Sequence, residues 1–154
     1  MIRLYTWSTP SGVKVSIALE ELGLDYEVIP IDITRDQQFT PEFLEISPNN
    51  KIPAIVDGDF SLFDSGAILL YLAQKTGKLA PPGDSPAYFK MMQWLMWQEA
   101  HFSPTLGQAL HFLKFNPGKS AYAEKRFYQE ALRLYRVLNS RLEGRDYIAD
   151  EFSI

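Results

Sequence analysis

The clearest indication of the fold lies in residues 54–75, "AIVDGDFSLFDSGAILLYLAQK". The first ten letters contain two short apolar runs with Asp-Gly between them, a pattern typical of an antiparallel β-hairpin. Asp64 and Ser65 follow as capping residues, and an apolar helical repeat runs from there to Lys75. Gly77 then ends the helix. The stretch therefore predicts two antiparallel strands followed by one helix.

The residues before this stretch predict a parallel strand–helix–strand unit. A buried strand is expected at residues 2–7, and a second strand at 26–32 contains Pro30, which indicates an edge position. The helix between them ends at Gly23 and has apolar residues at i, i+3, i+4 and i+7: Val15, Ala18, Leu19 and Leu22. At most a short helix is expected at 41–47. Parallel pairing of the first two strands requires a right-handed crossover.

The organisation changes after Gly77. Residues 78–84 are rich in Gly and Pro and read as a linker, and only helical patterns follow over residues 85–154. Ser85-Pro86 fits the start of a long aromatic helix containing "QWLMWQ". The next helix ends at Gly144 and has a core stripe made of Phe127, Ala131, Leu134, Leu138 and Leu142. The prediction is an α/β domain at residues 1–77 joined to an all-α domain.

Composition excludes several classes of function. The chain has 154 residues, is 46% hydrophobic, has a net charge of -4 and contains no basic block that would suit nucleic acid. Its longest apolar run, "GAILLYLA", is too short to span a bilayer, and no signal peptide is recognised, so we expect a cytoplasmic protein without a membrane partner. It has no cysteine, and His101 and His111 are ten residues apart, so no metal site is expected.

The corner between the first strand and the first helix, "TWSTPSG" at residues 6–12, offers hydroxyl groups and no thiol, histidine or lysine. Thr9 followed by Pro10 is a typical helix start, with a capping side chain and then proline at the first helical position. Any thiol chemistry at this corner therefore requires a thiol from outside the chain, which has no cysteine.

Four segments resemble the glutathione transferases, and among them the bacterial nu-class enzymes, which are glutathione-dependent disulfide reductases. These segments are "TPSGVKVSIALEELGLDYE", "QFTPEFLEISPNNKIPAIVD", "LFDSGAILLYLAQKTGKL" and "QWLMWQ". The resemblance implies a thioredoxin-like first domain, a helical second domain and glutathione as co-substrate. It also implies reduction of small disulfides or peroxides, weak conjugation to electrophiles, and a homodimer, for which Tyr71, Leu72 and the aromatic helix are the candidate contacts. The alternative is a glutathione-binding regulatory module without turnover. A cysteine-using glutaredoxin or omega-type enzyme is excluded.

In this family the bound tripeptide provides the sulfur. A free thiol has a pKa of about 8.5, and a helix N-terminus together with a donating hydroxyl favours the thiolate. The nu-class pattern at the corner is Thr-Pro-Asn-Gly, whereas this chain has Ser11 in place of the Asn. Ser11 is the predicted contact to the sulfur, and Thr9 is either a second catalytic hydroxyl or only the helix cap. Ser11 could likewise be completing that cap.

The resemblance assigns other site residues by position. Ile52 and Pro53 match the family's cis-proline loop, in which the Ile52 backbone pairs with the cysteinyl peptide of glutathione. Asp64 and Ser65 match the pair at the γ-glutamyl end, although capping alone would explain both. Gln38 and Lys51 match positions near the glutathione backbone and glycyl end, or are solvated loop residues.

The second domain contributes Arg126, which matches an arginine that reaches the ligand. The alternative is a surface pair with Glu130 at i, i+4. Four aromatic residues could line a substrate pocket, but a helix-spaced stripe is more typical of a core, which we predict here: Trp94, Trp97, Phe102 and Phe112. His101 and His111 are expected to be structural or wall residues.

One departure from the family pattern lies at the last residues. After "YIADEFSI" the family continues with Ala-Asp and opens a central helix, with the residue at Ser153 as its N-cap. This sequence stops at Ile154. We therefore expect a helical domain that is incomplete relative to the family.

Overall fold

A four-stranded mixed sheet forms the first of two units in the computed structural model, which describes all 154 residues. Its strands are β1 (Ile2–Thr6), β2 (Tyr26–Pro30), β3 (Ala54–Asp57) and β4 (Phe60–Phe63), in the order β2-β1-β3-β4. β1 and β2 are parallel, whereas β1–β3 and β3–β4 are antiparallel. The predicted parallel pair, the hairpin and the edge position of the strand containing Pro30 are confirmed. The two units are Met1–Ala80 with Ile154, and Pro81–Ser153.

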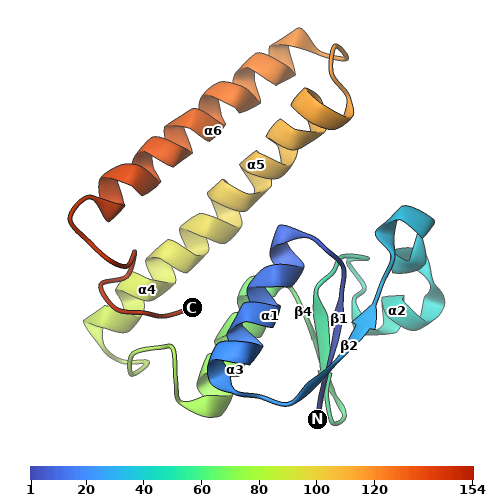
Figure 1. Cartoon of the computed structure of the whole chain (residues 1–154), viewed down its shortest axis with the longest axis vertical. Helices are drawn as coiled ribbons and strands as arrows, with labels where there is room; N and C mark the ends of the chain where they lie inside the picture. The colour runs from blue at the N-terminus through green and yellow to red at the C-terminus, as the bar shows by residue number, and fades with distance from the viewer. The chain divides into compact units, whose positions relative to one another are not determined.

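Helices cover both faces of this sheet (Figure 1). α1 (Pro10–Leu22) and α3 (Ser65–Thr76) pack against each other, and α2 (Pro41–Ile46) contacts β3 and β4. The largest fully buried apolar side chains of this unit are Leu4, Val15, Leu19, Ile55, Ile68 and Leu72. A second cluster, formed by Ile31, Phe43 and Ala54 with Tyr5 and Ile46 packed against it, lies beside α2. The alternation of side chains along each strand gives the sheet these two apolar faces.

The hairpin is tied to α3 through Asp57, the last residue of β3. Its Oδ2 atom accepts a hydrogen bond of 2.7 Å from the Tyr71 hydroxyl and lies 2.7 Å from Lys75 Nζ. The hydrogen bond from Lys75, and then that from Tyr71, lowers the pKa of Asp57 below its usual value. The turn itself is Gly58-Asp59, with φ of 62° at Gly58, so Asp57 belongs to the strand rather than to the turn.

The packing of α3 within its own unit bears on the prediction that Tyr71 and Leu72 contact a second copy. Leu72 has 0% exposure because it lies in the core of its own unit, and Tyr71 is bonded to Asp57. The helix periodicity placed both residues on one side, which is the side that packs inward. The prediction that Leu72 meets a second copy is therefore wrong.

Asp57→Asn is expected to lower the free energy of unfolding by about 1–2 kcal/mol at neutral pH, because it removes a charge that two donors share. The folded pKa of Asp57 is depressed, so its contribution is complete above the unfolded pKa of about 3.9 and is lost as the pH falls through the lower folded value. The difference in the free energy of unfolding between wild type and variant should thus be constant from pH 7 to about pH 5 and disappear below about pH 4. Urea titrations across this range measure it, and a gap independent of pH would contradict the assignment.

The second unit is helical. It contains α4 (Pro86–Trp97), the π-helical turn η3 (Gln98–Phe102), α5 (Ser103–Leu110), a second π-helical turn η4 (His111–Phe115), and α6 (Ala121–Leu142). The Ser85 hydroxyl accepts the Tyr88 N–H at 3.1 Å, which confirms the predicted start of α4. No helix in either unit combines the length and the apolar run that crossing a membrane requires.

The predicted long aromatic helix is thus interrupted twice. Pro104 has no N–H to continue the α-helical pattern, and the Ser103 N–H bonds instead to the Gln98 carbonyl five residues back. The aromatic side chains around this turn contact one another within the unit, but the four predicted core residues, Trp94, Trp97, Phe102 and Phe112, are only half-buried. Trp97 stacks on Phe102 with ring centroids 5.2 Å apart, and Phe102 meets Tyr135 of α6 at 5.2 Å. Phe112 stacks on Phe127 of α6 at 5.6 Å.

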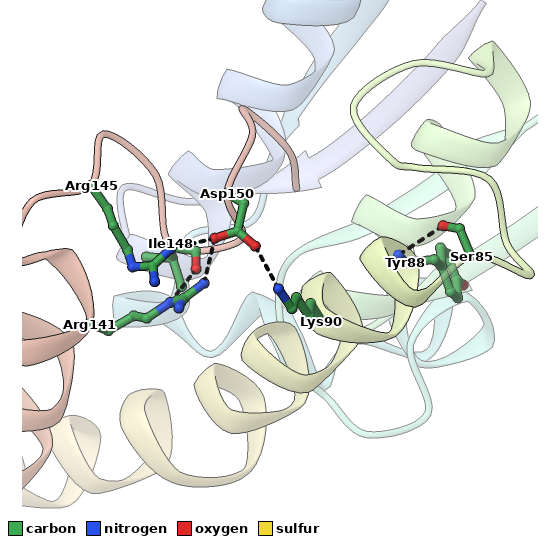
Figure 2. Close-up of polar contacts among 7 residues, drawn as sticks. All are labelled: Ser85, Tyr88, Lys90, Arg141, Arg145, Ile148 and Asp150. Carbon is green, nitrogen blue, oxygen red and sulfur yellow. Dashed lines mark hydrogen bonds and ion pairs between the residues drawn. The ribbon is translucent and has the colours of Figure 1, made fainter.

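A single carboxylate fastens residues 143–153 to the helices of this unit (Figure 2). The Asp150 carboxylate lies 3.1 Å from Lys90 on α4, and it accepts hydrogen bonds from Arg141 at 3.0 Å and Arg145 at 2.7 Å. The hydrogen bond from Lys90 is the main cause that lowers the pKa of Asp150. Arg141 Nε also donates to the Ile148 carbonyl at 2.7 Å. Residues 143–154 contain no helix or strand.

Candidate functional site

The strand register brings most of the predicted site residues to one edge of the sheet, the edge formed by the ends of the strands and not by a lateral strand. Thr6 at the end of β1 pairs with Pro30 at the end of β2, and Tyr5 pairs with Ala54 at the start of β3. Ala54 in turn pairs with Phe63 at the end of β4. Residues that follow β1, β2 and β4, or precede β3, therefore share this edge. The predicted residues that belong to these connections are Thr9, Ser11, Gln38, Lys51, Ile52, Pro53, Asp64 and Ser65.

At the start of α1 the structure separates the two candidate hydroxyls. Thr9 has extended backbone angles, and its Oγ1 accepts the Gly12 N–H at 3.3 Å, so it is the N-cap. Ser11 lies in the first turn of α1 and is half-buried, and neither its hydroxyl nor its N–H makes a hydrogen bond within the chain. Thr9 Oγ1 thus serves the helix as a cap acceptor, whereas Ser11 makes no hydrogen bond with the chain; the O–H of either residue can still donate to a ligand.

Close packing of α1 against the end of β1 holds this corner in place. Gly12 is buried, and a Cβ atom at this position would lie 2.7 Å from the Trp7 carbonyl oxygen and still closer to the Thr6 hydroxyl. Only glycine permits so near an approach. Nothing in the sequence around Gly12 predicts this role.

The Ile52–Pro53 bond is cis, as the resemblance implied. Pro53 is buried, and Ile52 is half-buried immediately before β3. The N–H and carbonyl of Ile52 make no backbone hydrogen bond within the chain. This residue therefore presents one unpaired donor and one unpaired acceptor at the sheet edge, the arrangement that pairs with an extended peptide.

The turn before Ile52 is held by Ser47, a residue that was not predicted to have a role. Its side chain has 0% exposure, and its Oγ donates to the Lys51 carbonyl at 2.8 Å. Asn50, with φ of 49°, donates its N–H to the Ser47 carbonyl at 2.9 Å. A serine before proline is typical of a solvated turn, so the sequence offered no signal that this one is buried.

Gln38 and Lys51 lie in different environments. Gln38 belongs to the short 3₁₀ turn η2 (Gln37–Phe39), which follows another such turn, η1 (Ile33–Arg35). Its Oε1 atom is buried without a hydrogen-bond partner, which is rare for a polar atom in a folded protein. Lys51 is exposed. The structure thus shields the Gln38 Oε1 atom from solvent and leaves the Lys51 side chain exposed.

At the start of α3, Asp64 acts as a cap. Its φ is 75°, and its carboxylate accepts the N–H groups of Gly66 and Ala67, both at 3.1 Å. Ser65, the first residue of α3, is only 5% exposed, which is unusual for a hydroxyl at a helix start. The capping alternative thus holds for Asp64.

Arg126 belongs to the other unit, on the exposed side of α6. The Glu130 carboxylate accepts hydrogen bonds of 2.6 to 3.0 Å from Arg133, the main cause that lowers its pKa, and Arg126 adds a weaker electrostatic attraction without a direct hydrogen bond. A surface pocket of about 530 Å³ lies here, lined by Tyr122, Lys125, Arg126, Gln129, Glu130 and Arg133. His101 and His111 are exposed, and no group of three or more potential metal ligands occurs in the chain.

The sheet order, the cis-proline before β3 and the capped helix after β4 define a thioredoxin-like domain. The family model for the glutathione S-transferase N-terminal domain matches residues 1–74. The chain is 48% identical to the disulfide-bond oxidoreductase YfcG of Escherichia coli K12 over 158 aligned positions, which cover 98% of this chain and 73% of that protein. The chain belongs to the glutathione S-transferase family.

Two solved structures of the family are similar over the whole chain. One is a glutathione transferase family member from Pseudomonas fluorescens with two glutathione molecules bound (46% identity, TM-score 0.93). The other is a glutathione transferase from Pseudomonas putida with one glutathione disulfide bound per subunit (42% identity, TM-score 0.92). Each match covers 99% of this chain, and 70% and 69% of the respective relatives.

Proposed function

We propose that this protein binds glutathione at the sheet edge and uses its thiol to reduce small disulfides or peroxides, with weak addition to electrophiles. One observation supports this most directly: the available hydroxyl of Ser11 lies in the first turn of α1, at the edge where Ile52 presents its unpaired backbone groups. Such a pair suits a short peptide that carries a thiol.

The residues present fit glutathione group by group. The Ile52 N–H and carbonyl can pair with the cysteinyl residue of the tripeptide as an added strand would. Gln38 is assigned to the glutathione backbone by its position in the family pattern. Ser65 at the start of α3 offers its hydroxyl and a helix N-terminus to the γ-glutamyl carboxylate.

Ser11 and α1 activate the thiol in this proposal. The start of α1 provides a partial positive charge, and the Ser11 hydroxyl provides a hydrogen-bond donor, both of which favour the anion over the neutral thiol. Two glutathione molecules supply the reducing equivalents: their two thiols are oxidised to one glutathione disulfide, while a substrate disulfide gains two electrons and two protons and becomes two thiols. The two relatives bind two glutathione molecules or glutathione disulfide, which agrees with this stoichiometry.

A steady-state assay tests the proposal. The chain is incubated with glutathione and 2-hydroxyethyl disulfide, and the glutathione disulfide formed is followed through glutathione reductase and NADPH. The proposal requires a rate above that of the uncatalysed exchange and proportional to protein concentration. Glutathione binding without such a rate would favour the regulatory module instead, and absence of binding would exclude both.

Ser65→Ala is expected to weaken glutathione binding about five- to thirtyfold, because a buried hydroxyl that bonds a carboxylate contributes about 1–2 kcal/mol. Isothermal titration calorimetry measures the dissociation constant. Ser61→Ala is the matched control, since Ser61 is an exposed residue of β4, and its affinity should equal that of wild type. Equal affinities for both variants would place the γ-glutamyl end elsewhere.

Three further assignments belong to the same proposal. Arg126, which has no ion-pair partner on α6, is available to a ligand carboxylate. The chain forms a symmetric homodimer, and its exposed aromatic side chains Phe60, Phe63 and Phe89 provide apolar surface for the contact. The activity belongs in the cytoplasm, where the glutathione pool is kept reduced.

A further inference from the structure

We propose that Ser47 is a positioning residue for glutathione, acting through the peptide between Lys51 and Ile52. This inference rests on the proposed function, and it adds a residue that never touches the ligand. Ser47 is the only fully buried polar side chain of the chain, with 0% exposure. A buried hydroxyl at that depth requires a specific partner.

Ser47 uses all three of its polar groups to fix the turn. Its N–H bonds to the Phe43 carbonyl at 2.8 Å and ends α2, its carbonyl accepts the Asn50 N–H at 2.9 Å, and its hydroxyl donates to the Lys51 carbonyl at 2.8 Å. The turn is therefore anchored to α2, whose Phe43 lies in the core at 2% exposure. Movement of the turn requires the loss of at least one of these bonds.

The last of these bonds determines where the Ile52 N–H points. The C=O and N–H of one trans peptide unit lie in a plane and point in opposite directions. Because Ser47 holds the Lys51 carbonyl toward the buried side, the Ile52 N–H of the same peptide is directed away from Ser47. That N–H makes no hydrogen bond within the chain, so it is held ready for an acceptor from outside. Pro53 cannot replace it, because proline has no N–H.

The test compares two variants at opposite ends of α2. Ser47→Ala removes the bond to Lys51, whereas Thr40→Ala removes the N-cap bond to the Phe43 N–H (3.4 Å) and leaves the turn intact. Both variants should be less stable than wild type. Only Ser47→Ala should raise the dissociation constant of glutathione, about three- to tenfold, with kcat at saturating glutathione changed less than the KM.

A second measurement uses the wild-type chain alone, in case Ser47→Ala does not fold. The Ile52 amide should exchange rapidly with solvent in the free protein and become protected when glutathione is added. Equal affinity of Ser47→Ala and wild type, equal weakening by both variants, or an Ile52 amide that glutathione leaves unprotected would overturn the inference. A wild-type chain that does not bind glutathione would refute the proposed function itself, an outcome distinct from these three.

Discussion

Replacing Ser11 by alanine is expected to raise the thiol pKa of bound glutathione by about one to two pH units. A donor to a charged acceptor contributes about 1.5–3 kcal/mol, and each pH unit corresponds to about 1.4 kcal/mol. Ser11 can give this donor because its hydroxyl has no partner in the chain. The thiolate absorbs in the ultraviolet more strongly than the neutral thiol, so a pH titration of the complex measures the change. The reductase rate below the new pKa should fall in proportion to the thiolate fraction.

Thr9→Ala provides the comparison at the same corner. Its Oγ1 accepts the Gly12 N–H, so its loss should lower the free energy of unfolding by about 1 kcal/mol and leave the thiol pKa nearly unchanged. Ser11→Asn restores the residue of the family pattern and should retain activity. If Thr9→Ala shifts the titration and Ser11→Ala does not, the two roles are reversed. If neither shifts it, the helix N-terminus alone stabilises the thiolate.

The fold could be predicted from local signals because each of them has one physical cause. The apolar repeat from Val15 to Leu22 matches the helical period. Val15 and Leu22, at the two ends of the repeat, are both buried, as that period requires. Pro30 lies on an edge strand because it cannot donate a ladder bond. The π-turn at Gln98–Phe102 was not predicted, because an aromatic periodicity gives no sign of where the hydrogen bonds shift by one residue.

The candidate site was predictable only in part. Residue type and position indicated Thr9 as a cap, and the structure agrees. Which of Ser11 and Thr9 donates to the sulfur depends on the direction of each O–H toward the ligand, which spacing does not specify. Ser47 and Gly12 were missed for a related reason. Their roles depend on contacts with Lys51 and Trp7, and local sequence patterns do not predict such contacts.

Gly12→Ala is expected to lower the free energy of unfolding by about 1–3 kcal/mol, the usual cost of forcing an extra methyl group into a packed site. The added Cβ would lie 2.7 Å from the Trp7 carbonyl oxygen, and that oxygen belongs to the backbone, so it cannot rotate away. Relief requires α1 to move away from the end of β1. Since Ser11 is the neighbouring residue, the same movement should weaken glutathione binding. Urea titration and calorimetry measure the two effects.

Gly107→Ala is the matched control, because the same substitution is expected to have the opposite effect on stability there. Gly107 is an exposed residue within α5, and a Cβ there would meet no atom within 4 Å. The same substitution should therefore stabilise the protein by about 0.5–1 kcal/mol, because alanine has the higher helix propensity. It should leave glutathione affinity unchanged. Opposite signs for the two variants would show that close approach to Trp7, rather than helix propensity, requires glycine at position 12. Stabilisation by both would mean that α1 has room to move at this corner, and that its fixed position does not hold Ser11 in place.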